Sequence, residues 1–414
     1  MRRVYRCCAG LDVHQKSVAA CIRRFKDRRV EIITAVFGTF TEDLRALSDW
    51  LKQHKVRHVA MESTGVYWIP VWNVLETGNR FELTLVNPQH ARAIPGKKTD
   101  HIDCQRLAEL HQYGLVRGSF MPPPAIRELR DLTRRRTHLQ QDRNRVINRI
   151  RRLLETVNIK LASVMSNVVG DTGRSILEGL ATTQLNRPEM FADLAKGSLK
   201  NKVEEIRKAL RVSLTEHFQF LLSELLDELD RLDKKVEMME ARIRQKMLPY
   251  EGYILRLCTI PGIQRITAWT ILAEIGVDMS KFPTADHLAS WAGLCPGNSE
   301  SAGKRKPAKT RKGNRYLRRI LTQSGWAIAR RKDDGFLTAM FFRIAKHAGM
   351  KKAAVAIAHR VLVIVHRLLS RGIDYVEPGA SYFDRLHPER TTKRLVHRLE
   401  QLGLHVIVSP RSSG

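Results

Sequence analysis

Four carboxylates stand out in this sequence because they lie at the ends of expected strands or in a short helical motif. Asp12 and Glu62 each follow a short apolar run, and Asp100 and Asp103 are three residues apart, which places them on one helical face. Divalent cations such as Mg²⁺ prefer carboxylate oxygens, and a two-metal site needs about three or four of them to converge. Any one of these acids alone is better explained as a helix cap or a surface acid. The four together predict a divalent-metal site.

A second candidate group is a serine in a loop that is rich in glycine, serine and lysine and extends from Gly293 to about Lys312. A serine hydroxyl is a weak nucleophile until a base, a metal or a positive field lowers the cost of forming the alkoxide. Ser301 precedes a long basic stretch that could hold a phosphodiester. Taken alone, the loop is more typical of a flexible surface connection, and Ser299 is an alternative nucleophile. The basic residues expected to contact nucleic acid here are Lys304, Arg305, Lys306, Arg311, Lys312, Arg315, Arg318 and Arg319.

The acids require a rigid scaffold, and residues 1–120 are expected to supply it as an α/β domain. Short β-favouring runs come first as a meander, and later runs alternate with helical segments, which predicts a sheet of mixed direction. The expected strands are 7–13, 17–22, 31–36, 58–62 and 83–87, and the expected helices begin at 41 and span 66–76.

Residues 121–250 are expected to be helical after a break at three consecutive prolines, Pro122 to Pro124. Apolar residues recur from Phe218 to Ile243 at alternating spacings of four and three, which predicts a coiled coil for self-association. The alternative is a long amphipathic helix packed within its own chain. The first helix of this region is strongly basic, and its residues expected to contact nucleic acid are Arg134, Arg135, Arg136, Arg143, Arg145 and Arg149.

A mostly α-helical domain is expected over residues 251–385, followed by a peripheral tail over 386–414. The segment from Ile260 to Ile263 contains Pro-Gly between helices and resembles a helix-hairpin-helix element, which offers backbone amides to phosphate. Further helices are expected over 285–292, 314–330 and 339–369. The predicted fold class is therefore α/β plus α.

Composition limits the partners of this protein. Its 414 residues include 72 Lys and Arg against 42 Asp and Glu, so the formal charge is +30 and a polyanionic partner is expected. A hydrophobic fraction of 43% excludes a disordered basic tail as the source of this charge. No signal peptide or membrane span is expected, which predicts a cytoplasmic protein without a membrane partner. The six cysteines form no zinc-binding spacing, so a zinc finger is not expected.

Four segments of the N-terminal half closely resemble successive motifs of the DEDD transposases of insertion-sequence family one-ten. These segments are Gly10-Leu11-Asp12-Val13-His14, 61–67, 86–88 and 98–103. The N-terminal domain of that family is similar to the resolvase RuvC, which has a ribonuclease-H-like sheet. The resemblance implies that Asp12, Glu62, Asp100 and Asp103 are catalytic and bind Mg²⁺, or Mn²⁺, near the scissile phosphate.

The C-terminal half resembles the same family over 291–296, 301–304 and 312–319. In that family the serine before a Gly-Lys element attacks the DNA backbone and remains joined to a DNA end. The resemblance implies this role for Ser301, although the usual Ser-Gly is Ser-Ala-Gly in this sequence.

The family resemblance implies a recombinase that acts on donor and target DNA, is guided by a structured bridge RNA, and works as dimers that join into tetramers at the nucleoid. Two other classes stay open on the residues alone. One is a metal-dependent Holliday-junction nuclease that uses water as the nucleophile. The other is a non-enzymatic nucleic-acid scaffold in which the four acids are structural.

Overall fold

The structure is a computed structural model in which the chain forms two compact units, Met1–Met121 and Pro122–Gly414. The residues that it describes are 3–87, 100–182, 188–295, 300–301, 304–305, 310, 312–331, 333, 335–386 and 388–409.

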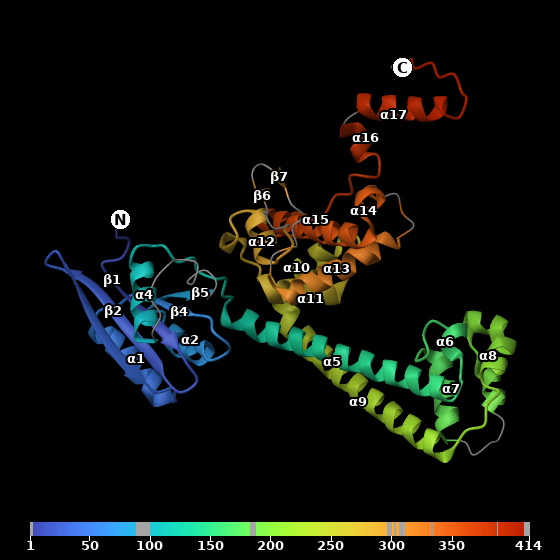
Figure 1. The fold of residues 1–414 in the computed structure, drawn as a ribbon, viewed down its shortest axis with the longest axis horizontal. Coiled ribbons are helices and arrows are strands. Elements are labelled where there is room, and N and C mark those ends of the chain that lie inside the picture. The colour runs from blue at the N-terminus through green and yellow to red at the C-terminus, as the bar shows by residue number, and fades with distance from the viewer. Residues whose placement is uncertain are drawn as a thin grey trace. The chain divides into compact units, whose positions relative to one another are not determined.

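The first unit is built on a five-stranded sheet with the strand order β3-β2-β1-β4-β5 (Figure 1). Neighbours among β1, β2 and β3 are antiparallel, whereas β4 is parallel to both β1 and β5. The mixed sheet expected from the sequence is therefore confirmed. Its strands are β1 (Cys7–Val13), β2 (Val18–Lys26), β3 (Arg29–Phe37), β4 (His58–Glu62) and β5 (Glu82–Val86).

Helices cover both faces of this sheet, and the alternation along β1 decides which side chain meets which helix. Leu11 and Val13 belong to a hydrophobic core with residues of α1 and α2, such as Leu47 and Val71. The intervening residues of β1 project to the other face, which is covered by α4. The helices of this unit are α1 (Thr41–Gln53), α2 (Trp68–Glu76) and α4 (Asp100–Gln112).

The second unit contains a long helical hairpin in which α5 and α9 lie side by side (Figure 1). The short helices α6, α7 and α8 pack at one end of the hairpin in a shared core, and α11 contacts α5 near the other end. The elements here are α5 (Pro124–Thr156), α6 (Leu161–Val164), α7 (Asp171–Thr182), α8 (Val203–Ala209), α9 (Glu216–Met247), and 3₁₀ turns at Pro188–Leu194, Gly197–Lys202 and Leu248–Tyr250.

The apolar seam of α9 is buried against α5 of the same chain. Phe218, Leu222 and Leu229 are buried in a core that they share with α5 residues such as Ile150. The structure therefore shows the intrachain packing that was the alternative for this seam, so the seam itself gives no support to association between copies. Ion pairs reinforce the hairpin, namely Arg136–Glu240, Arg143–Asp233, Arg149–Glu228 and Lys246–Glu128.

The rest of the second unit is a helical bundle around α15. This helix is long and apolar enough to cross a membrane by length and composition, but 50% of its apolar window is buried and it contacts α12, α13 and α14, so we interpret it as a core helix. The elements are α10 (Glu251–Cys258), α11 (Arg265–Ile275), a 3₁₀ turn at Met279–Lys281, α12 (Ala285–Trp291), β6 (Glu300–Ser301), β7 (Lys304–Arg305), α13 (Arg315–Ala329), α14 (Phe336–Ala348), α15 (Met350–Arg371), α16 (Tyr382–Leu386) and α17 (Pro388–Glu400).

Two glycines explain where this bundle turns. The single helix expected over 339–369 was wrong, because Gly349 has a φ of +85° and separates α14 from α15. Gly262, between α10 and α11, has a φ of +78°, and a Cβ there would lie 2.6 Å from a side-chain carbon of Ile328 in α13. The Pro-Gly turn is thus packed against α13, and its role in phosphate binding stays a prediction.

Candidate active site

Asp12 and Glu62 lie next to each other at the carboxyl ends of two neighbouring parallel strands. Leu11 of β1 pairs with Met61 of β4, and each acid is the next residue of its strand. Residues at the same register of parallel strands point to the same face of the sheet. Both carboxylates therefore project from the face that α4 covers, and both are partly buried.

Both carboxylates have short contacts to residues in the loops that follow their strands. His14 Nε2 lies 3.1 Å from Asp12 Oδ2, and Thr64 Oγ1 donates a hydrogen bond of 3.0 Å to Glu62 Oε1. The loop after β4 is in turn held on β5, because the backbone N–H and the hydroxyl of Ser63 both donate to one β5 carbonyl oxygen. These contacts limit the orientations of the two carboxylates.

Helix α4 crosses the same face of the sheet directly over β1. A Cβ at Gly10 would lie 2.4 Å from both the carbonyl oxygen of Cys104 and the amide nitrogen of Ala108, so only glycine permits this approach. Burial, together with the negative charge of Asp12, raises the pKa of the Cys104 thiol to about 11. Cys104 of α4 therefore lies near Asp12, and Asp103, the residue before Cys104, is on the helix that covers this face.

The fourth predicted acid, Asp100, is the first residue of α4, and its side chain lies outside the described residues. Among the side chains that the structure describes, no group of three Asp, Glu, His or Cys residues could hold a metal ion. The fold thus brings Asp12, Glu62 and Asp103 to one side of the sheet without a complete ligand set among those residues.

The predicted nucleophile, Ser301, lies in β6, which pairs with β7 as a small antiparallel ribbon. Ser301 is paired with Lys304, and Glu300 with Arg305. The side chains of these four residues, and all of Ser299, Lys306 and Arg311, lie outside the described residues. The ribbon therefore fixes only the backbone register between the serine and the first basic residues after it.

The two ends of the serine loop meet at a close backbone contact. A Cβ at Gly313 would lie 2.3 Å from the amide nitrogen of Gly293, so a side chain at this position would push the two ends apart. The next residue, Asn314, caps α13, because its Oδ1 accepts hydrogen bonds of 3.1 and 3.0 Å from the backbone N–H groups of Tyr316 and Leu317.

Asn314 also contacts a fully buried carboxylate, Glu274 of α11. The Asn314 side-chain amide donates to Glu274 Oε2 at 2.6 Å, and Arg134 of α5 donates to the two carboxylate oxygens at 2.7 and 2.8 Å. Arg130 Nε lies 3.2 Å from Oε2, and the guanidinium of Arg134 lies 4.6 Å from the ring centre of Tyr316. We call Arg130, Arg134, Glu274 and Asn314 the Glu274 cluster. It joins α5, α11 and the end of the serine loop.

The two arginines of the cluster respond differently to their surroundings. Burial lowers the pKa of Arg130 to about 10. Burial also opposes the charged form of Arg134, but the hydrogen bond and the charge of Glu274 outweigh it and raise the pKa of that guanidinium. Both arginines are ionised at neutral pH, so the buried carboxylate is balanced by positive charge.

Most of the α5 arginines expected to contact nucleic acid are engaged within the chain. Arg134 binds Glu274, Arg136 binds Glu240, Arg143 binds Asp233, Arg145 binds Asp142 and Arg149 binds Glu228. Arg135 is exposed. Pairing with acids of α9 and α11 therefore accounts for half of the α5 arginines, and binding of nucleic acid by these side chains stays a prediction.

The basic residues of α13 are arranged differently. Arg315, Arg318 and Arg319 line a shallow cavity of about 410 Å³ together with Trp326. Lys312 is exposed just before the helix. Guanidinium groups beside an indole ring form a surface that can contact both phosphates and bases.

Sequence reasoning missed the Glu274 cluster. One signal was available, because Glu274 is a single carboxylate in the otherwise apolar stretch from Ala268 to Ile275. A buried carboxylate needs cationic or hydrogen-bonding partners, but no local pattern indicates that Arg134, 140 residues earlier, provides them.

Comparisons with known proteins identify the family. A family model described as a transposase with a DEDD domain of the IS110 type matches residues 9–159, and a model of the IS116/IS110/IS902 transposase family matches residues 255–339. Together they cover more than half of the chain. The chain belongs to the IS110 family of transposases. It is therefore a DNA transposase, and the matched segments contain both the strand-end acids and Ser301.

Three relatives agree with this family. A Sinorhizobium fredii protein that carries the name of a transposase, y4pF/y4sB, is 25% identical over 73% of this chain and 71% of its own length. The transposase of insertion sequence element IS1328 from Yersinia enterocolitica is 24% identical over 64% of this chain and 69% of its own. An uncharacterized 43.6 kDa protein of insertion element IS110 from Streptomyces coelicolor is 29% identical over 46% and 50%.

Proposed function

We propose that this transposase cleaves and rejoins DNA through a covalent bond between Ser301 and a DNA phosphate, with a divalent metal bound by Asp12, Glu62, Asp100 and Asp103. The observation that carries the proposal is the register of β1 and β4, which places Asp12 beside Glu62 on the face that α4 covers. A structural role for the acids requires no such convergence. We also propose that the first unit has a ribonuclease-H-like fold.

Asp12 and Glu62, two partly buried carboxylates at neighbouring strand ends, have the oxygen ligands that Mg²⁺ and Mn²⁺ accept. In this proposal Asp100 and Asp103 of α4 complete the ligand set when the metal binds. Asp103 lies on α4, the helix that crosses the face from which Asp12 and Glu62 project. When bound, the metal would polarise the phosphate and favour the leaving oxygen.

In the proposed step, Ser301 Oγ attacks phosphorus while its proton passes to a base. The bond from Oγ to phosphorus forms, the bond from phosphorus to the leaving sugar oxygen breaks, and that oxygen takes up a proton. The phosphodiester is conserved as a phosphoserine bond, so a DNA hydroxyl can later displace the serine without an external energy source. Positive charge around the loop, including Lys304 and Arg305 by sequence, would stabilise the negative phosphorane-like transition state.

Detection of the covalent adduct tests this step. We expect end-labelled donor DNA to form a protein adduct on a denaturing gel with the wild type and with Ser299→Ala, but not with Ser301→Ala. Asp12→Asn should also abolish the adduct while DNA binding is retained. Cleavage by Ser301→Ala at the wild-type rate would instead indicate a nuclease that uses water. Full recombination by an Asp12→Ala, Glu62→Ala double variant would indicate a structural role for the acids.

The proposal includes an oligomer and a guide RNA. Recombination joins two duplexes, and the acids of one subunit could act with Ser301 of another, so mixing inactive Asp12→Asn protein with inactive Ser301→Ala protein should restore adduct formation if each active site combines residues of two subunits.

Sequencing of the nucleic acid that copurifies with the protein from cells tests the proposal that a bridge RNA guides it. A single structured RNA from the flanking region supports guidance, and a random RNA population contradicts it.

A further inference from the structure

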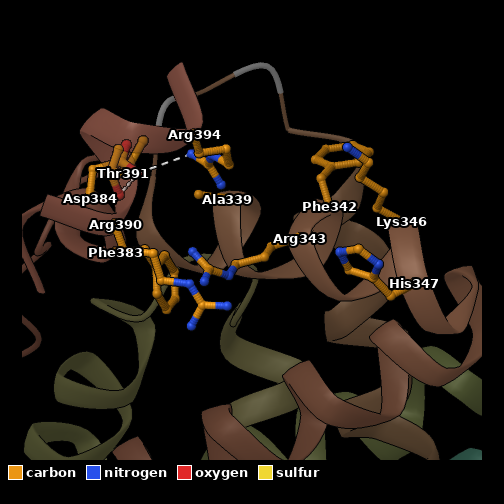
Figure 2. A pocket seen from close by; sticks show the side chains of 11 residues that line it. Ala339, Phe342, Arg343, Lys346, His347, Phe383, Asp384, Arg390, Thr391 and Arg394 are labelled. Atoms are coloured by element: carbon orange, nitrogen blue, oxygen red, sulfur yellow. Dashed lines mark hydrogen bonds and ion pairs between the residues drawn. The ribbon is translucent and has the colours of Figure 1, made fainter. Parts of the chain in front are cut away.

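A cavity of about 720 Å³ lies between α14 and the C-terminal helices α16 and α17 (Figure 2). Its volume lies in the range of about 300–1,000 Å³ that is usual for small-ligand sites. The two family models end at residues 159 and 339, so nearly all of its lining residues lie beyond the matched segments. The cavity therefore belongs to a part of the chain that the family comparison does not explain.

One face of α14 forms one wall of the cavity. Lys346 lies four residues after Phe342 and three after Arg343, so the three side chains lie on the same side of the helix, and all three are exposed. The opposite face of α14 is buried in the bundle through Leu337 and Phe341. Phe342 is 52% exposed, so its side chain is not part of the packed core of the bundle.

The opposite wall is formed by α16 and α17. Phe383 stacks on Phe336 of α14 with ring centres 5.2 Å apart, which holds α16 against the bundle. The guanidinium of Arg343 lies 5.1 Å from the ring centre of Phe383, and Figure 2 shows Arg343 between that ring and the Phe342 side of the cavity. Arg390 and Arg394 extend into the same cavity from α17.

Positive charge dominates this cavity. Arg343, Lys346, Arg390 and Arg394 line it, and Asp384 is the one acid among the lining residues, 3.6 Å from Arg394. Within the part of the chain that the structure describes, Lys346 and Arg390 show no ion pair. Two aromatic rings among several cations match a nucleotide, whose base stacks on an aromatic ring while its phosphate contacts Arg or Lys. Bases in a duplex are stacked on one another and cannot reach such rings, so a single strand fits better.

We propose that this cavity binds a single-stranded segment of nucleic acid, with a base on the exposed ring of Phe342 and its phosphates on Arg343, Lys346, Arg390 and Arg394. The inference depends on the protein being a transposase that handles nucleic acid. It does not depend on Ser301 chemistry or on the metal site, because binding can be measured without cleavage. It also gives a function to α17, whose Arg390 and Arg394 line the cavity and which lies in the segment that the sequence indicated only as a peripheral tail.

Photo-cross-linking and binding to the full-length protein test the proposal. The probes are 12-nucleotide strands of 4-thiouridine-substituted RNA and of 5-iodouracil-substituted DNA, with a DNA duplex as the competitor. We expect cross-links to map by mass spectrometry to the peptides that contain Phe342 or Phe383. Phe342→Ala should weaken single-strand binding by about 5-fold to 100-fold, because one stacked base is lost, and Phe342→Trp should restore it.

The charged wall gives a second readout. An Arg343→Ala, Arg394→Ala double variant should reduce the log–log salt slope of single-strand binding by about 1.4, or about 0.7 for each lost phosphate contact. Lys393→Ala on α17, which is exposed and does not line the cavity, serves as the matched control and should leave the slope unchanged. All substituted residues are exposed, and a thermal melt verifies the fold of each variant.

The results separate the alternatives. Tighter binding of the RNA probe or of the DNA probe identifies which type of single strand the cavity prefers. Either preference supports the site when the cross-links map to its peptides. Cross-links confined to other peptides, with wild-type affinity in Phe342→Ala and in the double variant, would overturn it. Equal competition by the duplex would also overturn it. Ser301→Ala must cross-link like the wild type, so failure of the proposed catalytic step is distinguishable from failure of this inference.

Discussion

Replacing Glu274 by glutamine would test whether the Glu274 cluster holds the end of the serine loop. Glutamine keeps the size of the side chain but removes the negative charge, and it leaves Arg130 and Arg134 ionised beside an amide. Glu274 is 0% exposed, and its carboxylate accepts hydrogen bonds from Arg134 and Asn314 and forms an ion pair with Arg130. Removing one partner of a buried ion pair costs about 3–5 kcal/mol, and we expect Glu274→Gln to destabilise this region by about 3 kcal/mol.

Hydrogen exchange measures this effect where it should occur. The backbone N–H groups of Tyr316 and Leu317 donate to Asn314, so they report on the cap of α13. A local loss of about 3 kcal/mol corresponds to about a 100-fold decrease in their protection. Formation of the Ser301 adduct should also fall in Glu274→Gln, because Asn314 must then compete with Arg130 and Arg134 for the single acceptor oxygen of glutamine.

Glu240→Gln is the matched control, because Glu240 also pairs with an α5 arginine, Arg136, but its side chain is 25% exposed. A partly exposed pair contributes about 1 kcal/mol or less. We expect this variant to leave the protection of the α13 amides near the wild-type value. If Glu274→Gln and Glu240→Gln show the same protection and the same adduct yield, the Glu274 cluster does not position the loop.

Two further predictions concern the first unit. Gly10→Ala should destabilise it by about 1–3 kcal/mol, measured by urea titration, and reduce cleavage, because the new Cβ would displace α4 and with it Asp103. Gly118→Ala is the control. A Cβ there would lie 3.4 Å from a side-chain carbon of Thr84, an ordinary van der Waals contact, so this variant should change neither stability nor cleavage. Burial, and then the charge of His58, lowers the pKa of His111 to about 4, so between about pH 4 and 6.5 the unfolded chain binds a proton that the folded chain does not. Stability should therefore fall by about 2 kcal/mol from pH 7.5 to 5.0, and His111→Phe should lack this part of the loss; an identical pH dependence in both proteins would contradict the assignment.

The strands of the first unit and the acids at their ends were predictable because both are local patterns. Alternation along 7–13 separates a core face from a second face, and the acids at the ends of the first and fourth strands lie on that second face. Parallel pairing of the two strands then brings Asp12 beside Glu62, so their proximity does not depend on a long-range side-chain contact that the sequence would have to reveal. The crossing of α4 over Gly10 was not predictable, since it depends on backbone atoms more than 90 residues away.

The packing partner of the long helix α9 could not be predicted from the sequence. The seam from Phe218 to Ile243 specified that one face of α9 must be buried, but periodicity does not identify the partner. The partner is α5 of the same chain, and its arginines meet the acids of α9. The same arginine content that indicated a nucleic-acid surface is therefore the complement of an intrachain acidic helix.

This pairing changes where the excess charge acts. The formal charge of +30 is not concentrated on α5, because acids of α9 and α11 balance most of its arginines that were expected to contact nucleic acid. Arginines beside aromatic rings are found instead on α13, in the cavity with Trp326, and between α14 and α17, in the cavity with Phe342 and Phe383. Both surfaces combine cations with aromatic rings that are at least partly exposed, whereas most of the α5 arginines pair with carboxylates. Salt-dependent binding of nucleic acid should therefore be more sensitive to substitutions on α13 and α14 than to substitutions on α5.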